Sequence, residues 1–265
     1  MTMMRGNGFP WAPAALAAAA LAACGPVVSE QAARLSENLL AMARESFERG
    51  DLGDALRKGF HAIEKNPTNA DASYFVGFVH AARGDYADAE RYLRRTIEID
   101  ATYTDARNTL GQILINQRRY REAIAILEEA AGDVMYPAPH LVQANLGQAC
   151  MESGDLDRAV EWLMRAVREQ PKFCVAYYRL GDALRRKGTL DAAEEALALA
   201  VAVDDAACRR LQPAWRMLGE VRLEMGRIGP AGEAFAECRD ADPATDDGRA
   251  CAAAAARIGD PPGGP

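Results

Sequence analysis

Cysteine and histidine are the side chains of this sequence with the widest chemical range, and it holds six of the first and three of the second. The cysteines stand at positions 24, 150, 174, 208, 238 and 251, and no two of them form a C-x-x-C pair. His61, His80 and His140 lie far apart, and none has a second ligating side chain four residues away. A zinc site needs several such ligands at short, regular spacing, so we expect no metal site.

Motifs that assemble an active site are also missing. The sequence contains no G-x-S-x-G, no P-loop, no G-x-G-x-x-G and no H-E-x-x-H. We therefore predict that the chain is not an enzyme and has no catalytic residue, no cofactor and no small-molecule substrate. Lys and Arg number 31 against 38 Asp and Glu, and the net charge of -7 repels phosphate backbones, so we expect no nucleic-acid partner.

Cys24 ends an N-terminal segment with the layout of an export signal. Arg5 is the only charge before a run of alanine and leucine that ends at this cysteine. Leu21-Ala22-Ala23-Cys24 resembles the lipobox of bacterial lipoproteins, in which the cysteine carries a lipid after cleavage. We predict a signal peptide over residues 1–23 and lipidation of Cys24; an ordinary secretory peptide cut near an incidental cysteine is the alternative.

The residue after Cys24 indicates which of the two bacterial membranes would hold the lipidated protein. In lipoproteins of this type an aspartate at that position commonly signals retention in the inner membrane, and here it is Gly25. The resemblance therefore implies a lipid anchor in the outer membrane, with the protein on the periplasmic face. Each buried methylene of an acyl chain contributes about 0.8 kcal/mol, so two or three chains give a durable anchor.

The other five cysteines lie in an oxidising compartment if the chain is exported, which favours at least one disulfide. Cys238 and Cys251 are the predicted pair, because they fall at similar heights on two antiparallel helices; the alternative is that both are small buried apolar residues. Cys150 and Cys174 fall at opposite ends of parallel helices, roughly 15 Å out of register, so we expect both to be unpaired.

A period near 34 residues runs through the rest of the chain. One row of glycines, each after an aliphatic residue, has intervals of 34, 36, 34 and 38: Gly77, Gly111, Gly147, Gly181 and Gly219. A second row follows seven residues later, at Gly84, Gly154, Gly188 and Gly226, with Gly50 ahead of them. A third row of alanines falls twelve residues after the first. The pattern resembles that of tetratricopeptide repeats, best at Trp215-x-x-Leu218-Gly219.

This periodicity predicts an all-α fold, a right-handed α-solenoid of about six tetratricopeptide repeats, each a pair of helices that small residues allow to approach closely. The predicted repeats cover residues 36–69, 70–103, 104–139, 140–173, 174–211 and 212–245. A linker over 24–35 precedes them. A capping helix over 246–258 closes the stack, and a disordered tail over 259–265 follows.

The first helix of each repeat is expected to line the concave surface, and its exposed positions predict a groove for another polypeptide. In the first two repeats these positions include Leu40, Arg44, Phe47, Tyr74 and Phe78. Such an apolar groove suits an amphipathic helix or an extended apolar segment. The alternative is that residues 27–35 fold back and fill it.

A narrower family resemblance rests on the middle of the chain. The order Tyr136-Pro137-Ala138-Pro139, Ala144-Asn145-Leu146-Gly147 and Gly154-Asp155-Leu156 is similar to that in the lipoproteins of type IV pilus biogenesis, the PilF, PilW and Tgl group. The lipobox and the number of repeats agree with it. The resemblance implies a pilotin, a non-enzymatic chaperone that helps secretin subunits reach the outer membrane and assemble there.

Two other binding functions compete with this interpretation. One is a general periplasmic scaffold or adaptor for envelope enzymes that act on peptidoglycan. The other is a co-chaperone that grips a C-terminal carboxylate; it requires lysine and asparagine on the concave surface, where the first repeats carry Leu40, Tyr74 and Phe78. The sequence disfavours the second.

Overall fold

The structure, a computed structural model, describes residues 28–205, Cys208 and residues 211–259. Within these residues the chain forms thirteen α-helices and no β-strand, and the all-α prediction is confirmed. The predicted signal peptide over 1–23, the predicted lipidation site Cys24 and residues 260–265 lie outside the described residues.

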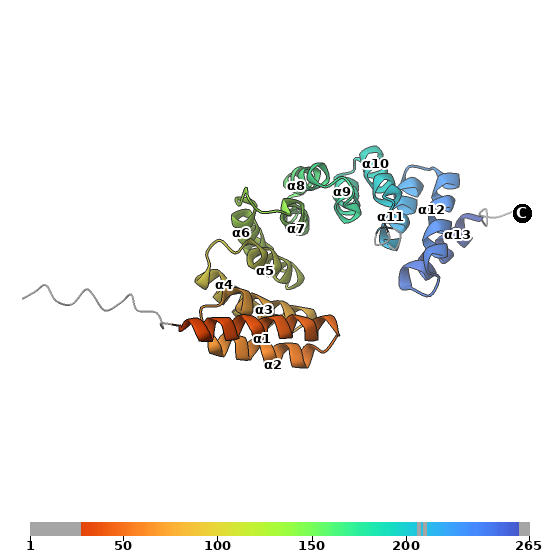
Figure 1. Ribbon diagram of the computed structural model, residues 1–265. Coiled ribbons are helices and arrows are strands. Elements are labelled where there is room, and N and C mark those ends of the chain that lie inside the picture. Colours follow the sequence, from red (N-terminus) through yellow and green to blue (C-terminus); the bar gives the residue numbers. More distant parts are fainter. Residues whose placement is uncertain (1–27, 206–207, 209–210, 260–265) are drawn as a thin grey trace, which may run out of the picture.

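Twelve of the helices form six hairpins in chain order, and Figure 1 shows these hairpins following one another along an arc. The hairpins are α1 (Glu30–Glu48) with α2 (Leu52–Lys65), α3 (Ala70–Arg83) with α4 (Tyr86–Ile99), α5 (Thr104–Asn116) with α6 (Tyr120–Ala131), α7 (Pro139–Ser153) with α8 (Leu156–Glu169), α9 (Cys174–Arg186) with α10 (Leu190–Ala202), and α11 (Gln212–Glu224) with α12 (Ile228–Ala241). The last helix, α13 (Asp246–Gly259), packs against α12 and α11.

The first hairpin begins earlier than the predicted boundary at residue 36. Ser29 accepts a hydrogen bond from the amide of Ala32 and caps α1, so residues 30–35 are the first turns of that helix. The described part of the segment 27–35 therefore continues α1 and does not fold back over the concave surface.

A residue in the left-handed conformation closes the turn inside each hairpin. Glycine fills this place in five hairpins, with φ between 75° and 92°. In the third hairpin Arg118 fills it, at φ 61°. The amide of Arg119 bonds to Leu114 O there, as the amide of Asp85 bonds to His80 O in the second hairpin, so the turn is the same although the glycine is missing.

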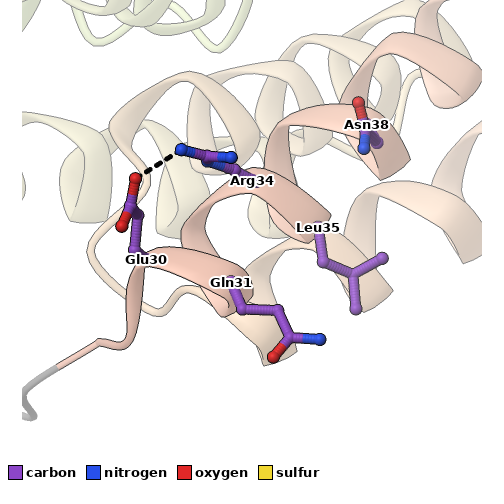
Figure 2. Close-up of a pocket in the computed structure, with 5 residues that line it drawn as sticks. All are labelled: Glu30, Gln31, Arg34, Leu35 and Asn38. Atoms are coloured by element: carbon purple, nitrogen blue, oxygen red, sulfur yellow. Dashed lines mark hydrogen bonds and ion pairs between the residues drawn. The ribbon is translucent and has the colours of Figure 1, made fainter.

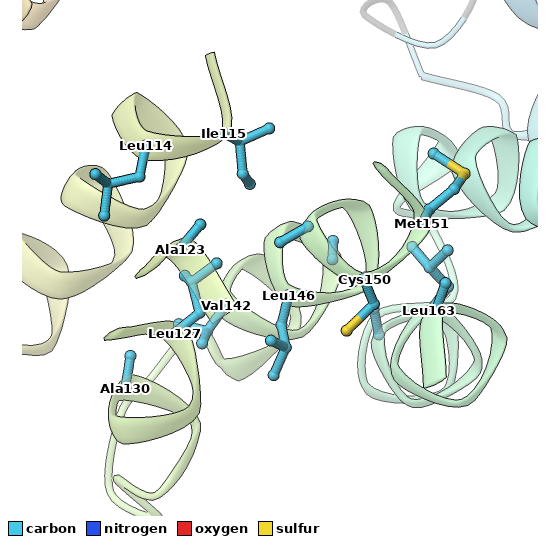
Figure 3. Close-up of a cluster of buried hydrophobic side chains, with 14 of the residues drawn as sticks. Leu114, Ile115, Ala123, Leu127, Ala130, Val142, Leu146, Cys150, Met151 and Leu163 are labelled. Carbon is cyan, nitrogen blue, oxygen red and sulfur yellow. The ribbon is translucent and has the colours of Figure 1, made fainter. Parts of the chain in front are cut away.

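The other glycine row sets the distance between the two helices of a hairpin. A Cβ atom added to Gly111 would lie 2.5 Å from Leu127, which is fully buried on the partner helix. Four more glycines of this row meet a large side chain sixteen residues later in the same way: Gly77, Gly147, Gly181 and Gly219. Figure 3 shows part of the core that results, with Leu127, Leu146 and Leu163 pointing inward from successive helices.

The odd-numbered helices line the inside of the arc. Each contacts the odd-numbered helix of the next hairpin, whereas even-numbered helices approach one another far less. Because successive hairpins lie closest together on the inner side of a curved stack, the surface of α1, α3, α5, α7, α9 and α11 is the concave face, as Figure 1 shows for α5 to α11.

Candidate partner-binding site

Aromatic rings gather on the concave face at its N-terminal end. Phe47 on α1 lies 5.4 Å from Phe78 on α3, measured between ring centroids. Tyr74 lies 6.2 Å from Phe78 and 5.0 Å from Tyr103, which precedes α5. Phe78 is 38% exposed, whereas Phe47 and Tyr74 are half-buried. We call these four residues, Phe47, Tyr74, Phe78 and Tyr103, the aromatic trough.

The prediction that Leu40 lines this groove is wrong. Leu40 is 5% exposed and packs into the core of the first two hairpins with Leu56 and Val76. It belongs to the buried stripe of α1 that repeats every three or four residues, together with Ala43. Arg44, the remaining predicted groove residue, is exposed on α1.

Two tyrosine hydroxyls, whose contacts the repeat pattern does not predict, link the third and the fourth repeat each to the repeat before it. The hydroxyl of Tyr103 donates to Asp71 Oδ1 at 2.7 Å, and the hydroxyl of Tyr136 donates to Asp105 Oδ1 at 2.5 Å. Burial is the main cause that raises the pKa of both phenols above its ordinary value, and the hydrogen bond to the carboxylate adds to it. Tyr103 directly precedes α5, whereas Tyr136 lies three residues before α7, so the two tyrosines do not share a place in the repeat and its period could not have revealed them.

Polar side chains of three odd-numbered helices form a ladder in the middle of the concave face. Asn145 Nδ2 on α7 donates to Asn108 Oδ1 on α5 at 2.9 Å. Asn145 Oδ1 accepts from Arg179 on α9 at 3.2 Å. Asn145 is buried, and Asn108 and Arg179 are half-buried. We call these three residues the amide ladder.

Ion pairs occupy the C-terminal part of the same face. Arg185 on α9 binds Glu220 at 2.6 Å and Glu224 at 2.5 Å, both on α11. Arg186 binds Asp182 at 2.9 Å and Glu152 at 3.2 Å. The charges of this part are thus matched within the chain, and the concave face changes from aromatic to amide to ionic along the stack.

Two disulfides lie in the C-terminal half. Cys238 on α12 and Cys251 on α13 are joined, with their Cα atoms 6.0 Å apart, which fastens the last helix to the stack. Cys174, at the start of α9, is joined to Cys208, so the prediction that Cys174 is unpaired is wrong. Cys208 lies four residues before α11, in an insertion that lengthens the interval between the fifth and sixth repeats to 38 residues, so the disulfide joins this connection to the start of α9.

Cys150 is a free thiol in the core. It is fully buried on α7, and burial raises its pKa to about 11, so it remains protonated at neutral pH and is a poor nucleophile. Figure 3 shows it among aliphatic side chains.

The three histidines lie in unrelated environments. His80 is buried in a cluster with the rings of Phe60 and Tyr92, which also contact each other. His140 meets Phe173 edge-on, and His61 is exposed. Burial lowers the pKa of His140. In the part of the chain that the structure describes, no group of three potential ligands is arranged to hold a metal ion.

The outer face of α1 is the N-terminal end of the stack that the structure describes. Figure 2 shows a shallow hollow there that is lined by residues of α1 alone, with the Glu30–Arg34 ion pair beside it. Leu35 and Met42 are 43% and 47% exposed on this helix. None of the described helices is long and apolar enough to cross a membrane.

Three family models, each described as tetratricopeptide repeat, match the chain. One covers residues 40–104 and 108–172, the second covers 80–134 and the third covers 175–206. The chain belongs to the tetratricopeptide repeat family. The matches extend from the first to the fifth hairpin, in agreement with the glycine and alanine rows of the sequence.

A curated relative of this tetratricopeptide repeat protein is the type IV pilus assembly protein PilF of Pseudomonas aeruginosa. It is 30% identical over 125 residues, which are 46% of this chain and 48% of the relative. The match therefore spans about half of the relative's length, and it shows that the two are homologous over that part.

Solved structures agree on the fold. PilW, described as a widely conserved type IV pilus biogenesis factor, superimposes with a TM-score of 0.73 at 19% identity and covers 82% of this chain and 98% of its own. Pseudomonas aeruginosa PilF gives 0.71 at 18% identity, with 85% and 100% covered. YrrB, a TPR protein with an unusual peptide-binding site, gives 0.55 at 19% identity, with 74% and 97% covered.

Proposed function

We propose that this chain is an outer-membrane lipoprotein pilotin. In this function it binds secretin subunits through its concave face and promotes their targeting to the outer membrane and their multimerisation for type IV pilus assembly. The homology to PilF carries the proposal, because the name of that relative places it in type IV pilus assembly. The chain acts by binding, since tetratricopeptide repeats generally present surfaces for other polypeptides.

Two features support export and anchoring. The Cys174–Cys208 and Cys238–Cys251 disulfides suit the oxidising periplasm, where such bonds persist. The Leu21-Ala22-Ala23-Cys24 motif supplies a lipid attachment site, and Gly25 in place of aspartate favours the outer membrane. A short linker from Cys24 to α1 then holds the concave face close to the periplasmic surface of that membrane.

The aromatic trough supports the choice of contact surface. Phe78 exposes 38% of its surface beside Phe47 and Tyr74, and none of the described segments of this chain covers the three rings. Buried aromatic anchors dominate the affinity of many interfaces, so an apolar segment of an unassembled secretin subunit would gain most of its binding energy here.

Complementation of a gene deletion tests the proposal. We expect the deletion to remove heat-resistant secretin multimers from the outer membrane while the subunit is still made, and the intact gene to restore them. Phe78→Ser should fail to restore them, whereas Phe60→Ser, a matched control with the same 38% exposure on α2, should restore them. A Phe78→Ser protein that melts with the wild type and assembles normal multimers would contradict the proposed contact.

Membrane fractionation tests the anchor separately. Cys24→Ala should move the protein out of the outer-membrane fraction, and an unchanged membrane pool would contradict lipidation. Normal pili in the deletion strain, together with several unrelated envelope enzymes in a pull-down, would instead support the periplasmic scaffold.

A further inference from the structure

The connection between α6 and α7 exposes two adjacent hydrophobic side chains. It covers residues 132–138 and is longer than the connections before α3, α5 and α9, which cover 66–69, 100–103 and 170–173. Val134 is 92% exposed and Met135 is 85% exposed, whereas Ile228, at 58%, is the next most exposed large hydrophobic residue among those that the structure describes. Single hydrophobic residues are common on protein surfaces, but an adjacent pair that is almost wholly exposed indicates a contact with another apolar surface.

Hydrogen bonds hold this α6–α7 connection in one conformation. The amide of Met135 donates to Asp133 Oδ1 at 3.0 Å, and the hydroxyl of Thr104 donates to Asp133 Oδ2 at 2.5 Å. The hydroxyl of Tyr136 binds Asp105 on α5. The two hydrophobic side chains are therefore presented by a fixed backbone, and a surface that covers them need not order the connection first.

The α6–α7 connection lies on the edge of the stack at which the odd-numbered helices begin. Each hairpin is antiparallel, so every connection between hairpins returns the chain to the edge where α1 starts. Contacts run along this edge: the hydroxyls of Tyr136 and Tyr103 bind the second residues of α5 and α3. Asn69, which caps α3, donates to Ser36 Oγ in α1 at 2.9 Å. Neighbouring helices lie about 10 Å apart, so roughly 30 Å separate this connection from the start of α1 along the edge.

The predicted lipid anchor joins the molecule at the same edge. Only residues 25–28 separate Cys24 from Ser29, which caps α1. A fully extended chain of this length spans at most about 17 Å, so an anchored Cys24 keeps the start of α1 within that distance of the bilayer. The edge that carries Val134 and Met135 is therefore the edge that a lipidated protein turns towards the membrane.

The charges of this edge indicate the kind of lipid surface that suits it. Asp100, Asp105 and Asp133 line a shallow hollow together with Met135, and no lysine or arginine lines it. These carboxylates repel a strongly anionic surface, whereas the ammonium group of a zwitterionic headgroup such as phosphatidylethanolamine is attracted to them.

We propose that Val134 and Met135 insert into the bilayer that holds the lipidated Cys24, at a surface rich in ethanolamine headgroups. The inference rests on the proposed function, because it assumes the lipid anchor. It adds a second, noncovalent membrane contact, whose strength comes from the apolar area that leaves water. Two contacts on one edge fix the orientation of the concave face relative to the bilayer, which an anchor at one end alone leaves free.

Quenching by brominated acyl chains tests the contact in the lipidated protein. The protein is reconstituted in vesicles of equal parts phosphatidylethanolamine and phosphatidylcholine, and Val134→Trp is compared with Ile228→Trp, an exposed hydrophobic position at the opposite edge. The wild type gives the emission of the native tryptophans. We expect brominated lipid to remove more than half of the emission that Val134→Trp adds and none of the emission that Ile228→Trp adds, while both variants melt with the wild type. Equal losses in the two variants, or no loss in either, would overturn the inference.

Hydrogen exchange on the same vesicles tests the native side chains. We expect the amides of residues 133–136 to exchange about threefold or more slowly in the wild type than in Val134→Ser/Met135→Ser, after correction for intrinsic rates. The amides of α12 are the control and should exchange equally in both proteins. Equal rates at residues 133–136 would contradict insertion of the native side chains.

Flotation of the vesicles and secretin assembly separate this inference from the proposed function. A protein that floats with the vesicles but shows no quenching at position 134 overturns the inference alone. A wild type that does not float overturns the lipid anchor, and the inference with it. Quenching at position 134, together with normal secretin multimers in the deletion strain, overturns the pilotin function alone.

Discussion

The backbone of Arg118 is strained, whereas that of the corresponding residues in the other hairpins is not. Its φ of 61° is the left-handed conformation, which costs a residue with a Cβ atom about 1 kcal/mol, and glycine occupies this place in the other five turns. We expect Arg118→Gly to raise the free energy of unfolding by about 0.5–1 kcal/mol, measured by urea denaturation followed by circular dichroism. Arg121→Gly, at an exposed helical position of α6, is the control and should lower it. Equal losses in both variants would show that the turn is not strained.

For single residues, the repeat pattern does not always predict whether a side chain is buried or which residue it contacts. Its repeat position predicts that Leu40 lies in the groove, but Leu40 belongs to the buried stripe of α1. A shift of one position around a helix is enough to separate a core residue from a surface residue. The repeat does set the helix faces that bring together the rings of Phe47, Tyr74 and Phe78. Cys208 was missed as the partner of Cys174 because it lies in an insertion, where the period no longer indicates a height along the stack.

At the scale of the elements, the spacing of the helices in a hairpin depends on the missing side chain of a glycine. A methyl group at Gly111 would lie 2.5 Å from Leu127, and the fully buried leucine has no space into which to move. We expect Gly111→Ala to lower the free energy of unfolding by about 1–3 kcal/mol. Gly232→Ala in α12 meets no atom within 4 Å and should stabilise the protein by up to about 1 kcal/mol through its helix propensity. The comparison of the two urea curves is the measurement, and a gain in both would contradict the steric argument.

The helix pairs can be predicted from the sequence because glycine is required where two helices approach closely and where the chain turns between them. The row that starts at Gly77 marks the closest approach of two helices, and the row that starts at Gly50 marks the turns, so both the number of hairpins and their order follow from two simple physical requirements. The repeat pattern does not predict the ladder of Asn108, Asn145 and Arg179, because the ladder depends on the register between helices of neighbouring repeats. Residue type gives no guide either, since Arg186 on the same helix as Arg179 forms an ion pair with Asp182 instead.

At the scale of the whole molecule, the contacts of a stacked chain are local. α13 packs against α12 and α11, where Cys251 and its neighbours cover Phe235 and Cys238. The aromatic trough lies at the other end, on α1 and α3. In such an array stability is nearly a sum of repeat and interface contributions, so damage at one end weakens the adjacent repeat first.

Removal of α13 tests this independence. A chain that stops after Thr245 loses the Cys238–Cys251 disulfide and uncovers Phe235, so α11 and α12 should open locally and exchange their amide hydrogens faster. Helices α1 to α6 share no contact surface with α13, so their protection from exchange should be unchanged, and the aromatic trough should keep its affinity for a partner. Hydrogen exchange read by mass spectrometry resolves the two ends. Faster exchange in α1 to α6 would mean that the stack unfolds as one cooperative unit, and the C-terminal cap would then control the partner site from the far end of the molecule.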